Sequence, residues 1–352
     1  MATFSLPAGL PETVKAVLQP DIQTTDLVLT TIPLPKPTHP DDVLVRVHAS
    51  APCNGELLWA KNYPAMIPAG KLAVVGQDMA GTVVAAPAAS GFTASDEVFC
   101  RIDAARPGSA SEYTLARASE LARKPRTLNW VDAASVPLSA LTAWQAVFEQ
   151  GSLEAAGLRG DAAARQRNGA KRVLVTGASG SVGRWAVQLA ALAGAGAVVA
   201  LAGAAQGPKA DAVRALGATE VVSYRETTLD DWVAADRAAR ECDLVVDMVG
   251  GSTLAGCWSV AKAGSGELIS VNTPPDMAKP ATLSSKTLGK SLFFIVSPRG
   301  SDLVQIAELI DAGKLRPAVD RAYAMEDFAA AFDRVESGKA QGKVIIKISD
   351  EA

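Results

Sequence analysis

The chain has 352 residues and a formal net charge of −3, and 49% of its residues are hydrophobic. This length suits two domains better than one small core. The near-neutral charge and the lack of a Lys/Arg block argue against nucleic-acid binding. The first residues resemble no secretory signal, and Arg184, Gln188 and two glycines interrupt the longest apolar stretch, 182–205. We therefore expect a cytoplasmic protein without a membrane span.

The four cysteines, Cys53, Cys100, Cys242 and Cys257, stand far apart in the sequence. None belongs to a C-x-x-C pair, so the sequence offers neither a zinc knuckle nor a disulfide framework. This spacing fits a reducing compartment.

The first 140 residues read as β-rich, with short strands separated by proline and glycine, which predicts a barrel-like domain. The alternation of apolar and polar residues over 42–49 predicts a half-buried antiparallel strand. Gly81, within another strand, indicates a bulge or a close backbone approach. The expected strands cover 14–18, 27–34, 42–49, 74–86, 96–100 and 111–116.

A regular alternation of strands and helices begins near residue 171 and predicts a doubly wound parallel sheet. The segments are 173–176, 182–193, 197–202, 209–216, 220–223, 229–240 and 244–248, preceded by a helix over 138–149. After an apolar strand over 293–296 the alternation stops. The tail contains helices over 303–312 and 325–337 and strands over 318–323 and 343–348.

The stretch 171–183 joins an apolar strand, a glycine-rich turn and the start of a helix. In such a turn Gly177 permits the tight bend, Gly180 lets backbone N–H groups approach a pyrophosphate, and Gly183 lets the helix lie close to the strand. The N-terminus of the helix adds a partial positive charge. We therefore expect a dinucleotide to bind at Gly177, Ser179, Gly180, Ser181, Val182 and Gly183.

Several segments, in a fixed order, resemble the medium-chain dehydrogenase/reductase superfamily in its zinc-independent, quinone-oxidoreductase-like branch. They include Gly76-Gln-Asp-Met-Ala-Gly-Thr-Val, Ala133-Ala-Ser-Val-Pro, Leu141-Thr-Ala-Trp, Val175-Thr-Gly-Ala-Ser-Gly-Ser-Val-Gly, Asp243-Leu-Val-Val-Asp-Met-Val-Gly-Gly and Gly338-Lys-Ala-Gln-Gly-Lys-Val-Ile-Ile. The resemblance implies an α/β protein with a GroES-like, β-rich catalytic domain, residues 1–140 and 301–352. A Rossmann NADPH-binding domain, residues 141–300, would be inserted between them.

Short-chain dehydrogenases share this glycine turn, but they begin with it and need a Tyr-x-x-x-Lys pair, in which the lysine lowers the pKa of the tyrosine. Here the turn follows about 170 residues, and none of the four tyrosines has a lysine four positions later. We reject this alternative.

Zinc-dependent members of the superfamily hold their catalytic metal with Cys, His and Cys. In this chain the resemblance places Cys53, Gln77 and Leu138 at those positions, so one ligand of three remains and we predict no zinc. Cys53 stays a candidate catalytic residue, with a buried or cleft-lining thiol as the alternative.

The end of the strand over 197–202 indicates the cofactor, because NAD-binding folds carry an acidic residue there for the ribose 2′-hydroxyl. This chain has no Asp or Glu between that strand and Asp211, whereas Lys209 follows the turn. Resemblance to NADPH-dependent reductases assigns Lys209 and Tyr224 to the 2′-phosphate and adenine end. We expect NADPH, although Lys209 is also compatible with a solvated helix-start residue.

At the nicotinamide end, the resemblance implies a further set of cofactor contacts. Asn272 ends a strand, where its amide would hydrogen-bond the carboxamide of the cofactor. Lys343 is either a cofactor contact or a surface lysine before a strand. The implied contacts are Thr142, Gly250, Val271, Asn272, Phe294, Val296 and Lys343.

Without a Lewis acid, hydride addition to a plain ketone is difficult, whereas a conjugated C=C or a quinone spreads the developing charge. Tyr63 is the proton donor implied by similarity to enoyl-thioester reductases, with a loop tyrosine packed on the domain as the alternative. The branch usually shows Asn-Pro-x-Asp where this chain has Cys53-Asn54-Gly55-Glu56. Apolar candidates for a substrate pocket or for the core are Trp59, Met66 and Trp144.

These observations predict an NADPH-dependent reductase of an enone, an enoyl thioester or a quinone. A homodimer fits the habits of related reductases. One alternative is a zinc-free carbonyl reductase or alcohol dehydrogenase. Another is a redox-silent, NADPH-binding regulatory protein, which the altered Cys53–Glu56 segment would favour.

Overall fold

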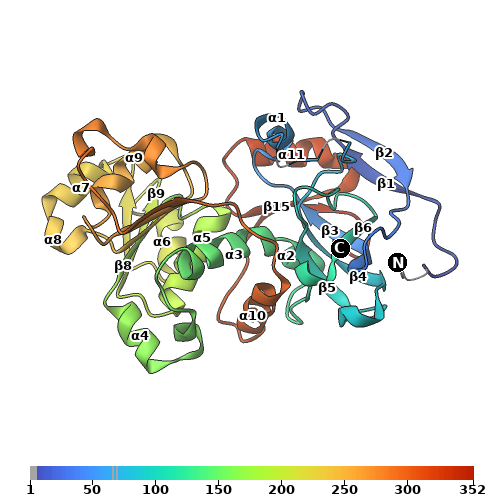
Figure 1. The fold of residues 1–352 in the computed structure, drawn as a ribbon, viewed down its shortest axis with the longest axis horizontal. Helices are drawn as coiled ribbons and strands as arrows, with labels where there is room; N and C mark the ends of the chain where they lie inside the picture. The colour runs from blue at the N-terminus through green and yellow to red at the C-terminus, as the bar shows by residue number, and fades with distance from the viewer. Residues whose placement is uncertain (1–5, 66, 69) are drawn as a thin grey trace. The chain divides into compact units, whose positions relative to one another are not determined.

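The computed structural model describes residues 6–352 except residues 66 and 69. The chain forms two units (Figure 1). Unit 1 comprises the chain up to Leu141 together with Ser297–Ala352, and unit 2 comprises Thr142–Val296. The first boundary falls inside helix α3 (Pro137–Trp144). The tail therefore folds with the N-terminal part of the chain.

Unit 2 contains a six-stranded parallel sheet in the order β10-β9-β8-β11-β12-β13. Its central strands are almost wholly apolar and buried, as expected for a parallel sheet covered on both faces. The strand order reverses between β8 and β11, and ligands of such sheets bind at this point. The strands are β8 (Arg172–Val175), β9 (Ala197–Ala202), β10 (Glu220–Ser223), β11 (Leu244–Asp247), β12 (Glu267–Ser270) and β13 (Lys290–Phe293).

Helices cover both faces of this sheet (Figure 1). Helices α5 (Ser181–Leu192) and α6 (Pro208–Arg214) follow β8 and β9, while α7 (Leu229–Ala235) and α9 (Gly251–Val260) share an apolar core with the other face. Helix α4 (Ala162–Gly169) precedes the sheet. These elements give the doubly wound architecture that the alternation of segments predicts.

The expectation of one continuous helix over 229–240 is wrong. Helix α7 ends before Asp236, and a separate helix α8 (Arg237–Arg240) follows. Asp236 has an extended backbone with φ of −158°, and its side chain accepts a hydrogen bond from the Ala239 N–H. The residue therefore acts as an N-cap and starts a new helix.

Unit 1 contains a seven-stranded sheet with the strand order β14-β15-β3-β4-β5-β7, and β6 pairs with β3. All of these pairs are antiparallel except β14 with β15. A separate hairpin joins β1 (Thr13–Leu18) and β2 (Val28–Pro33). The strands of the sheet are β3 (Asp42–Ala51), β4 (Asp78–Ala85), β5 (Glu97–Arg101), β6 (Tyr113–Arg117), β7 (Ala122–Arg123), β14 (Val319–Ala324) and β15 (Lys343–Lys347).

Strand β3 is buried along almost its whole length, so the expectation of a half-buried strand is wrong; only Arg46 is exposed. Helix α2 (Trp130–Ala134) packs on β3, and the Trp130 ring stacks on His48 with a centroid distance of 4.2 Å. The His48 ring also hydrogen-bonds Ser349 and Thr82. A helix and the chain tail thus cover the face that the alternation assigns to solvent.

Gly81 in β4 meets the backbone of β3, as its position in the sequence predicts. A Cβ atom there would lie 2.3 Å from the Arg46 carbonyl oxygen, and the β3–β4 register shifts nearby. The tail adds helices α10 (Gly300–Asp311) and α11 (Phe328–Glu336), and β15 pairs with β3. The C-terminal segment is therefore part of the sheet that carries the catalytic-domain candidates.

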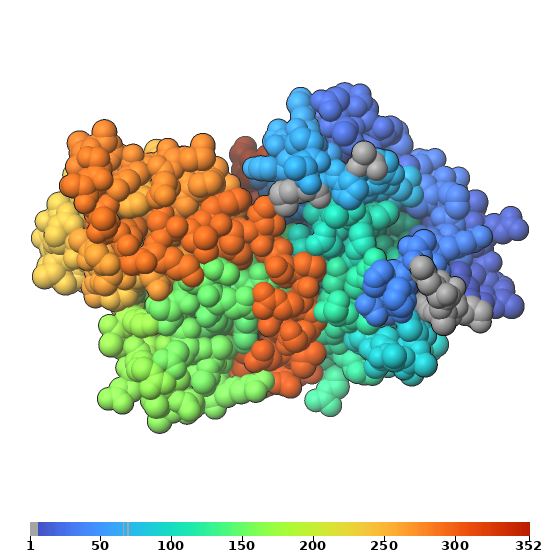
Figure 2. All heavy atoms as spheres, in the orientation of Figure 1, coloured from blue at the N-terminus to red at the C-terminus, as the bar shows by residue number. Residues whose placement is uncertain are grey.

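Within the described residues, every helix is too short or too polar to cross a membrane. In the space-filling view, the orange residues that follow β11 form a large part of the visible surface of unit 2 (Figure 2). They include the connection between β12 and β13, in which Met277 is 81% exposed.

Candidate functional site

The glycine turn of unit 2 connects β8 to α5 and is built for close packing. A Cβ atom at Gly183 would lie 2.3 Å from the Gly177 carbonyl oxygen, so no larger residue fits there without moving the helix. Gly180 is the N-cap of α5 and provides no side-chain cap. The first N–H groups of this helix therefore remain available to an anion. This cradle fits the pyrophosphate of a dinucleotide.

The predicted turn residues lie together around the start of α5. Ser179, Ser181 and Val182 are partly exposed around the start of α5, and Gly183 is buried beneath them. Gly177 has φ of +56°, a conformation that glycine adopts without strain. Backbone groups, rather than charged side chains, form this part of the site.

Asp247, at the end of β11, organises the neighbouring strand ends and is a residue that the sequence argument missed. It is fully buried, and its Oδ1 accepts hydrogen bonds from Thr176 Oγ1 at 2.8 Å and the Val249 N–H at 3.2 Å. Its Oδ2 accepts from the Gly250 N–H and Ser270 Oγ, both at 3.0 Å. One carboxylate thus fixes the ends of β8, β11 and β12. The sequence signal that could have identified Asp247 is an acidic residue at the end of an apolar strand, shortly before two glycines.

The candidates for the nicotinamide end lie partly together at these strand ends. A Cβ atom at Gly250 would lie 2.4 Å from Asn272 Oδ1, so the glycine and the amide are in direct proximity. The Val271 N–H donates to the Asp247 carbonyl at 3.0 Å, and the Phe294 N–H donates to Ser270 O at 3.2 Å.

The remaining candidates of this group are placed as follows. Strand β13 ends at Phe293, so the expected strand over 293–296 begins and ends too late, and Phe294 and Val296 follow it as partly buried residues. Thr142 is buried in α3.

The end of β9 carries a small residue, Gly203, instead of an acid. A Cβ atom at Gly203 would lie 3.1 Å from the Tyr224 hydroxyl, so this tyrosine lies directly against the strand end. The Arg225 guanidinium lies 5.9 Å from the centre of the Tyr224 ring. Lys209 is exposed in the first turn of α6. Arg225, which the sequence argument did not name, is therefore a further cation beside Tyr224 at this strand end.

In unit 1, Glu56 joins two loops around Cys53. Its Oε2 accepts the Cys53 N–H and its Oε1 accepts the Gly76 N–H, both at 2.7 Å. Burial raises the pKa of Glu56 to about 7, although these two hydrogen bonds oppose the change. Burial also raises the pKa of Cys53 to about 11, so its thiol is neutral near pH 7. The sequence marked Glu56 only as a departure from the branch pattern.

Lys343 is buried, so the alternative of a surface lysine is wrong. Its Nζ lies 2.8 Å from Asp78 Oδ2 and donates to the Pro52 carbonyl at 3.2 Å. Asp78 Oδ1 accepts the Leu138 N–H at 2.6 Å. Burial lowers the pKa of Lys343, but the charges of Asp78, Cys53 and Glu56 and the hydrogen bond to Asp78 together outweigh it, so the net pKa is raised. The ammonium group of Lys343 is thus committed to an ion pair inside unit 1.

The residues at the family's metal positions do not fit a catalytic zinc. Leu138 offers no ligand atom, and Gln77 replaces a histidine that would bind far better. Nowhere in residues 6–352, leaving aside 66 and 69, do three or more His, Cys, Asp or Glu side chains gather as metal ligands. Both ring nitrogens of His48 are engaged by Ser349 and Thr82.

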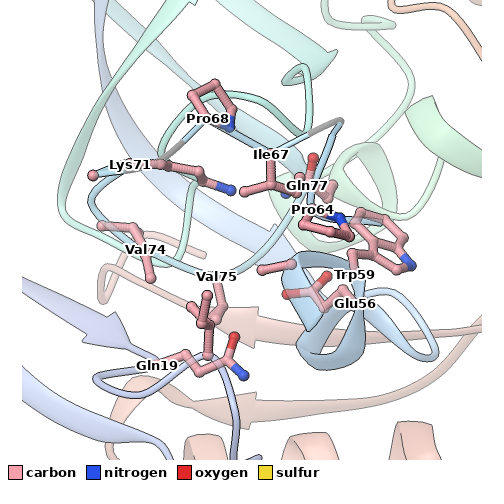
Figure 3. A pocket seen from close by; sticks show the side chains of 14 residues that line it. Gln19, Glu56, Trp59, Pro64, Ile67, Pro68, Lys71, Val74, Val75 and Gln77 are labelled. Atoms are coloured by element: carbon pink, nitrogen blue, oxygen red, sulfur yellow. The ribbon is translucent and has the colours of Figure 1, made fainter. Parts of the chain in front are cut away.

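A pocket of about 250 Å³ lies in unit 1 between the β1–β2 connection, the Glu56–Asn62 segment and the loop before β4 (Figure 3). Trp59 is one of its lining residues. Tyr63 is 46% exposed and follows α1 (Trp59–Asn62), next to the lining residue Pro64, but is not itself in the lining. Trp144 is buried in α3 against Phe148 and lines no part of it. Met66 lies outside the described residues.

Two family models match the chain: the alcohol dehydrogenase GroES-like domain over residues 39–126, and the zinc-binding dehydrogenase family over residues 216–346. The chain is 44% identical to "Probable zinc-binding oxidoreductase, mitochondrial" of Arthroderma benhamiae, over 97% of this chain and 98% of that protein. It is 30% identical to human "NAD(P)H oxidoreductase RTN4IP1, mitochondrial", over 78% of this chain and 70% of that protein.

A plant relative and a solved structure extend this similarity. "Quinone-oxidoreductase homolog, chloroplastic" of Spinacia oleracea is 30% identical over 78% of this chain and 79% of that protein. The crystal structure of an alcohol dehydrogenase superfamily protein from Novosphingobium aromaticivorans matches with a TM-score of 0.77 and 27% identity, over 96% of this chain and 100% of that chain.

These relatives correct the expected location. The fungal and human proteins are named mitochondrial and the spinach protein chloroplastic. The expectation of a cytoplasmic protein is therefore wrong, and the relatives point to an organelle. The fold, the glycine turn and the near full-length similarity agree on the class of protein. The chain belongs to the medium-chain dehydrogenase/reductase superfamily, as a quinone-oxidoreductase-like oxidoreductase with a nicotinamide cofactor.

Proposed function

We propose that this protein is an NADPH-dependent reductase that works without zinc on an activated C=C bond, in an enone or enoyl thioester, or on a quinone. The observation that carries this proposal is the pair of unlike sites in the two units. Unit 2 offers an intact dinucleotide cradle, whereas the metal positions of unit 1 hold Cys53, Gln77 and Leu138.

The preference for NADPH rests on the end of β9. An acid at this position would repel a 2′-phosphate, and the chain has Gly203 there instead, with Tyr224 against it. Lys209 and Arg225 are exposed, positively charged residues of the same unit, and they follow β9 and β10 in the chain. The turn over residues 177–183 would hold the pyrophosphate. Gly250, Asn272 and their neighbours at the strand ends would hold the nicotinamide.

The substrate class rests on chemistry without a Lewis acid. An isolated ketone would need strong stabilisation of an alkoxide, which a metal usually provides. A conjugated carbonyl compound delocalises the charge and needs only hydrogen bonds to its oxygen. A relative from spinach is named a quinone-oxidoreductase homolog, which agrees with this class.

When bound, NADPH supplies a hydride to the β carbon of an enone or to a quinone, and one proton completes the saturated ketone or the hydroquinone. Tyr63, or a water molecule, would supply that proton. Tyr63 is half-exposed at the end of α1, so it can exchange its own proton with solvent after each turnover.

The test is turnover of a panel of enones, enoyl thioesters and quinones, followed by loss of nicotinamide absorbance. We expect oxidation of NADPH in preference to NADH by the chelator-washed protein. The variants Lys209→Ala and Arg225→Ala should each raise the KM for NADPH about tenfold, equivalent to about 1.4 kcal/mol, and leave that for NADH nearly unchanged. Absence of turnover on every member of the panel would overturn the proposal.

A further inference from the structure

The pocket of unit 1 is lined by both apolar and polar side chains (Figure 3). The apolar lining includes Trp59, Pro64 and Val75, and the polar lining residues are Gln19, Glu56, Lys71 and Gln77. Its volume of about 250 Å³ lies just below the range of about 300–1,000 Å³ that is typical of sites for drug-sized ligands. A single ring or a short conjugated chain matches this size.

Gln77 is the unusual residue among these polar side chains. It is 3% exposed and lines the pocket, yet its Oε1 is buried and accepts no hydrogen bond from the described residues. The Gln77 Nε2 donates to none of the groups in that part of the chain and, unlike Oε1, is not fully buried. Burying an amide without partners costs free energy, so buried amides in folded proteins are normally satisfied. The Nε2 group of this residue, which lines the pocket, is therefore available to donate to an acceptor atom of a ligand.

The backbone around Gln77 is held firmly, so the free amide is not a consequence of a loose loop. The Gln77 carbonyl accepts the Ile102 N–H at 2.7 Å. Gly76 donates to Glu56 Oε1 at 2.7 Å and accepts the Ser109 N–H at 2.8 Å. A Cβ atom at Gly76 would lie 2.4 Å from Ser50 Oγ, so the turn also requires glycine. A rigid backbone that presents an unpaired side chain is the arrangement of a preorganised binding group.

Lys71 adds a positive charge to the lining of the pocket. Its Nζ donates to the Ala104 carbonyl at 2.8 Å, which uses one of its three N–H donors. Burial lowers the pKa of Lys71, and the charges of Glu56 and Asp103 oppose this change. Figure 3 shows the Lys71 side chain directed toward Ile67, with Gln77 beyond it in this view.

We propose that Gln77, assisted by Lys71, binds the oxygen of a conjugated cyclic ketone or quinone whose ring lies against Trp59, Pro64 and Val75. This proposal rests on the proposed reductase function and names the group that replaces a metal in it. The Gln77 Nε2 and the Lys71 ammonium donate to the carbonyl oxygen. These bonds strengthen as hydride addition moves negative charge onto that oxygen.

The test compares Gln77→Leu with Gln19→Leu, because both glutamines are buried and line the same pocket but only one has partners. The Gln19 Nε2 donates to the carbonyls of Thr24 and Leu57, both at 2.7 Å. For Gln77→Leu we expect kcat/KM for cyclohexenone and for benzoquinone to fall about 10²–10³-fold. Its Kd for NADPH stays unchanged, and its thermal stability stays equal or rises, because no internal hydrogen bond is lost. For Gln19→Leu we expect a lower Tm.

The infrared carbonyl stretch of bound cyclohexenone gives a second readout, which is independent of turnover. We expect it to shift to lower wavenumber in the wild-type protein and in Gln19→Leu, and to lose this shift in Gln77→Leu. If the wild-type protein turns over the panel but Gln77→Leu keeps its kcat/KM and the shifted stretch, the assignment of Gln77 is overturned and the reductase function stands. A wild-type complex without a shifted stretch also overturns it. Turnover restricted to enoyl thioesters overturns the cyclic ligand.

If the wild-type protein shows no turnover, the proposed function fails. A shift that is present in the wild-type protein and lost in Gln77→Leu would then still support the pocket as a carbonyl-binding site. A marked fall in Tm for Gln77→Leu, like that for Gln19→Leu, would instead assign Gln77 a structural role and overturn the inference.

Discussion

Glu56 should make the stability of unit 1 depend on pH, and Glu56→Gln should remove this dependence. The carboxyl group is 8% exposed, and burial raises its pKa from 4.5 to about 7. An acid whose pKa is raised in the folded state contributes stability that is complete below its unfolded pKa. This contribution is lost as the pH rises through the folded pKa. The affected window therefore runs from pH 4.5 to about pH 7.

The size of the effect follows from the same two pKa values. The interval between 4.5 and about 7, at about 1.4 kcal/mol for each pKa unit, corresponds to about 3 kcal/mol of unfolding free energy. For a domain of roughly 150–250 residues this equals a change in Tm of roughly 6–12 °C. The Tm of the wild-type protein, relative to Glu56→Gln, should fall by this amount between the two ends of the window.

Calorimetry of both proteins across this pH range is the assay. All other titratable groups are present in both proteins, so their effects cancel in the difference. The amide that Glu56→Gln introduces keeps one acceptor for the two N–H groups of Cys53 and Gly76, so a constant offset between the curves is expected. Parallel curves, with an offset that does not change with pH, would refute the reasoning about burial.

Three further predictions concern the packing of the two sites. Gly183→Ala places a methyl group 2.3 Å from the Gly177 carbonyl oxygen, and we expect a fluorescence titration to show a Kd for NADPH raised at least about tenfold. In the control Gly169→Ala, the nearest contact of the new methyl group is 3.8 Å away, so the Kd should not change. Asp247→Ala leaves four hydrogen-bond donors without their acceptor and should lower the unfolding free energy of unit 2 by about 3 kcal/mol or more. Backbone amides of residues 247–251 should then exchange hydrogen faster, and unchanged exchange would contradict the role of Asp247 in fixing the strand ends. Lys343→Met leaves the buried Asp78 carboxylate without its cation and should lower the unfolding free energy measured in urea by about 3–5 kcal/mol. Adding Asp78→Asn to this variant should restore part of the loss, and equal stability of the single and double variants would argue against the ion pair.

The parts of the fold that the sequence predicted are those with local signals. The turn at Gly177–Gly183 joins a strand and a helix within a few residues, so spacing alone identifies it. The alternation of strands and helices after it likewise depends on neighbouring residues, and the parallel sheet of unit 2 agrees with it. The break at Asp236 was missed because the helical spacing of apolar residues continues across this position, whereas the aspartate side chain itself favours capping the start of a new helix.

The features that sequence reasoning missed join residues that are far apart in the chain. Burial of β3 depends on α2 and on the C-terminal tail, and the strand pattern itself contains no information about either cover. Asp247 acquires its role only when three parallel strands end at one place. Lys343 becomes buried because its strand brings it to Asp78. The cellular location was mispredicted because charge and composition govern solubility and partners rather than the compartment.

The measurement that tests the central claim most directly is transfer of deuterium from NADPH labelled at C4 to cyclohexenone, with protein that has been washed with a chelator and assayed for zinc. The account predicts that deuterium enters the β carbon of the saturated ketone at a rate that does not depend on added zinc. Activity that appears only when zinc is restored, or a protein that retains zinc in stoichiometric amount, would contradict it.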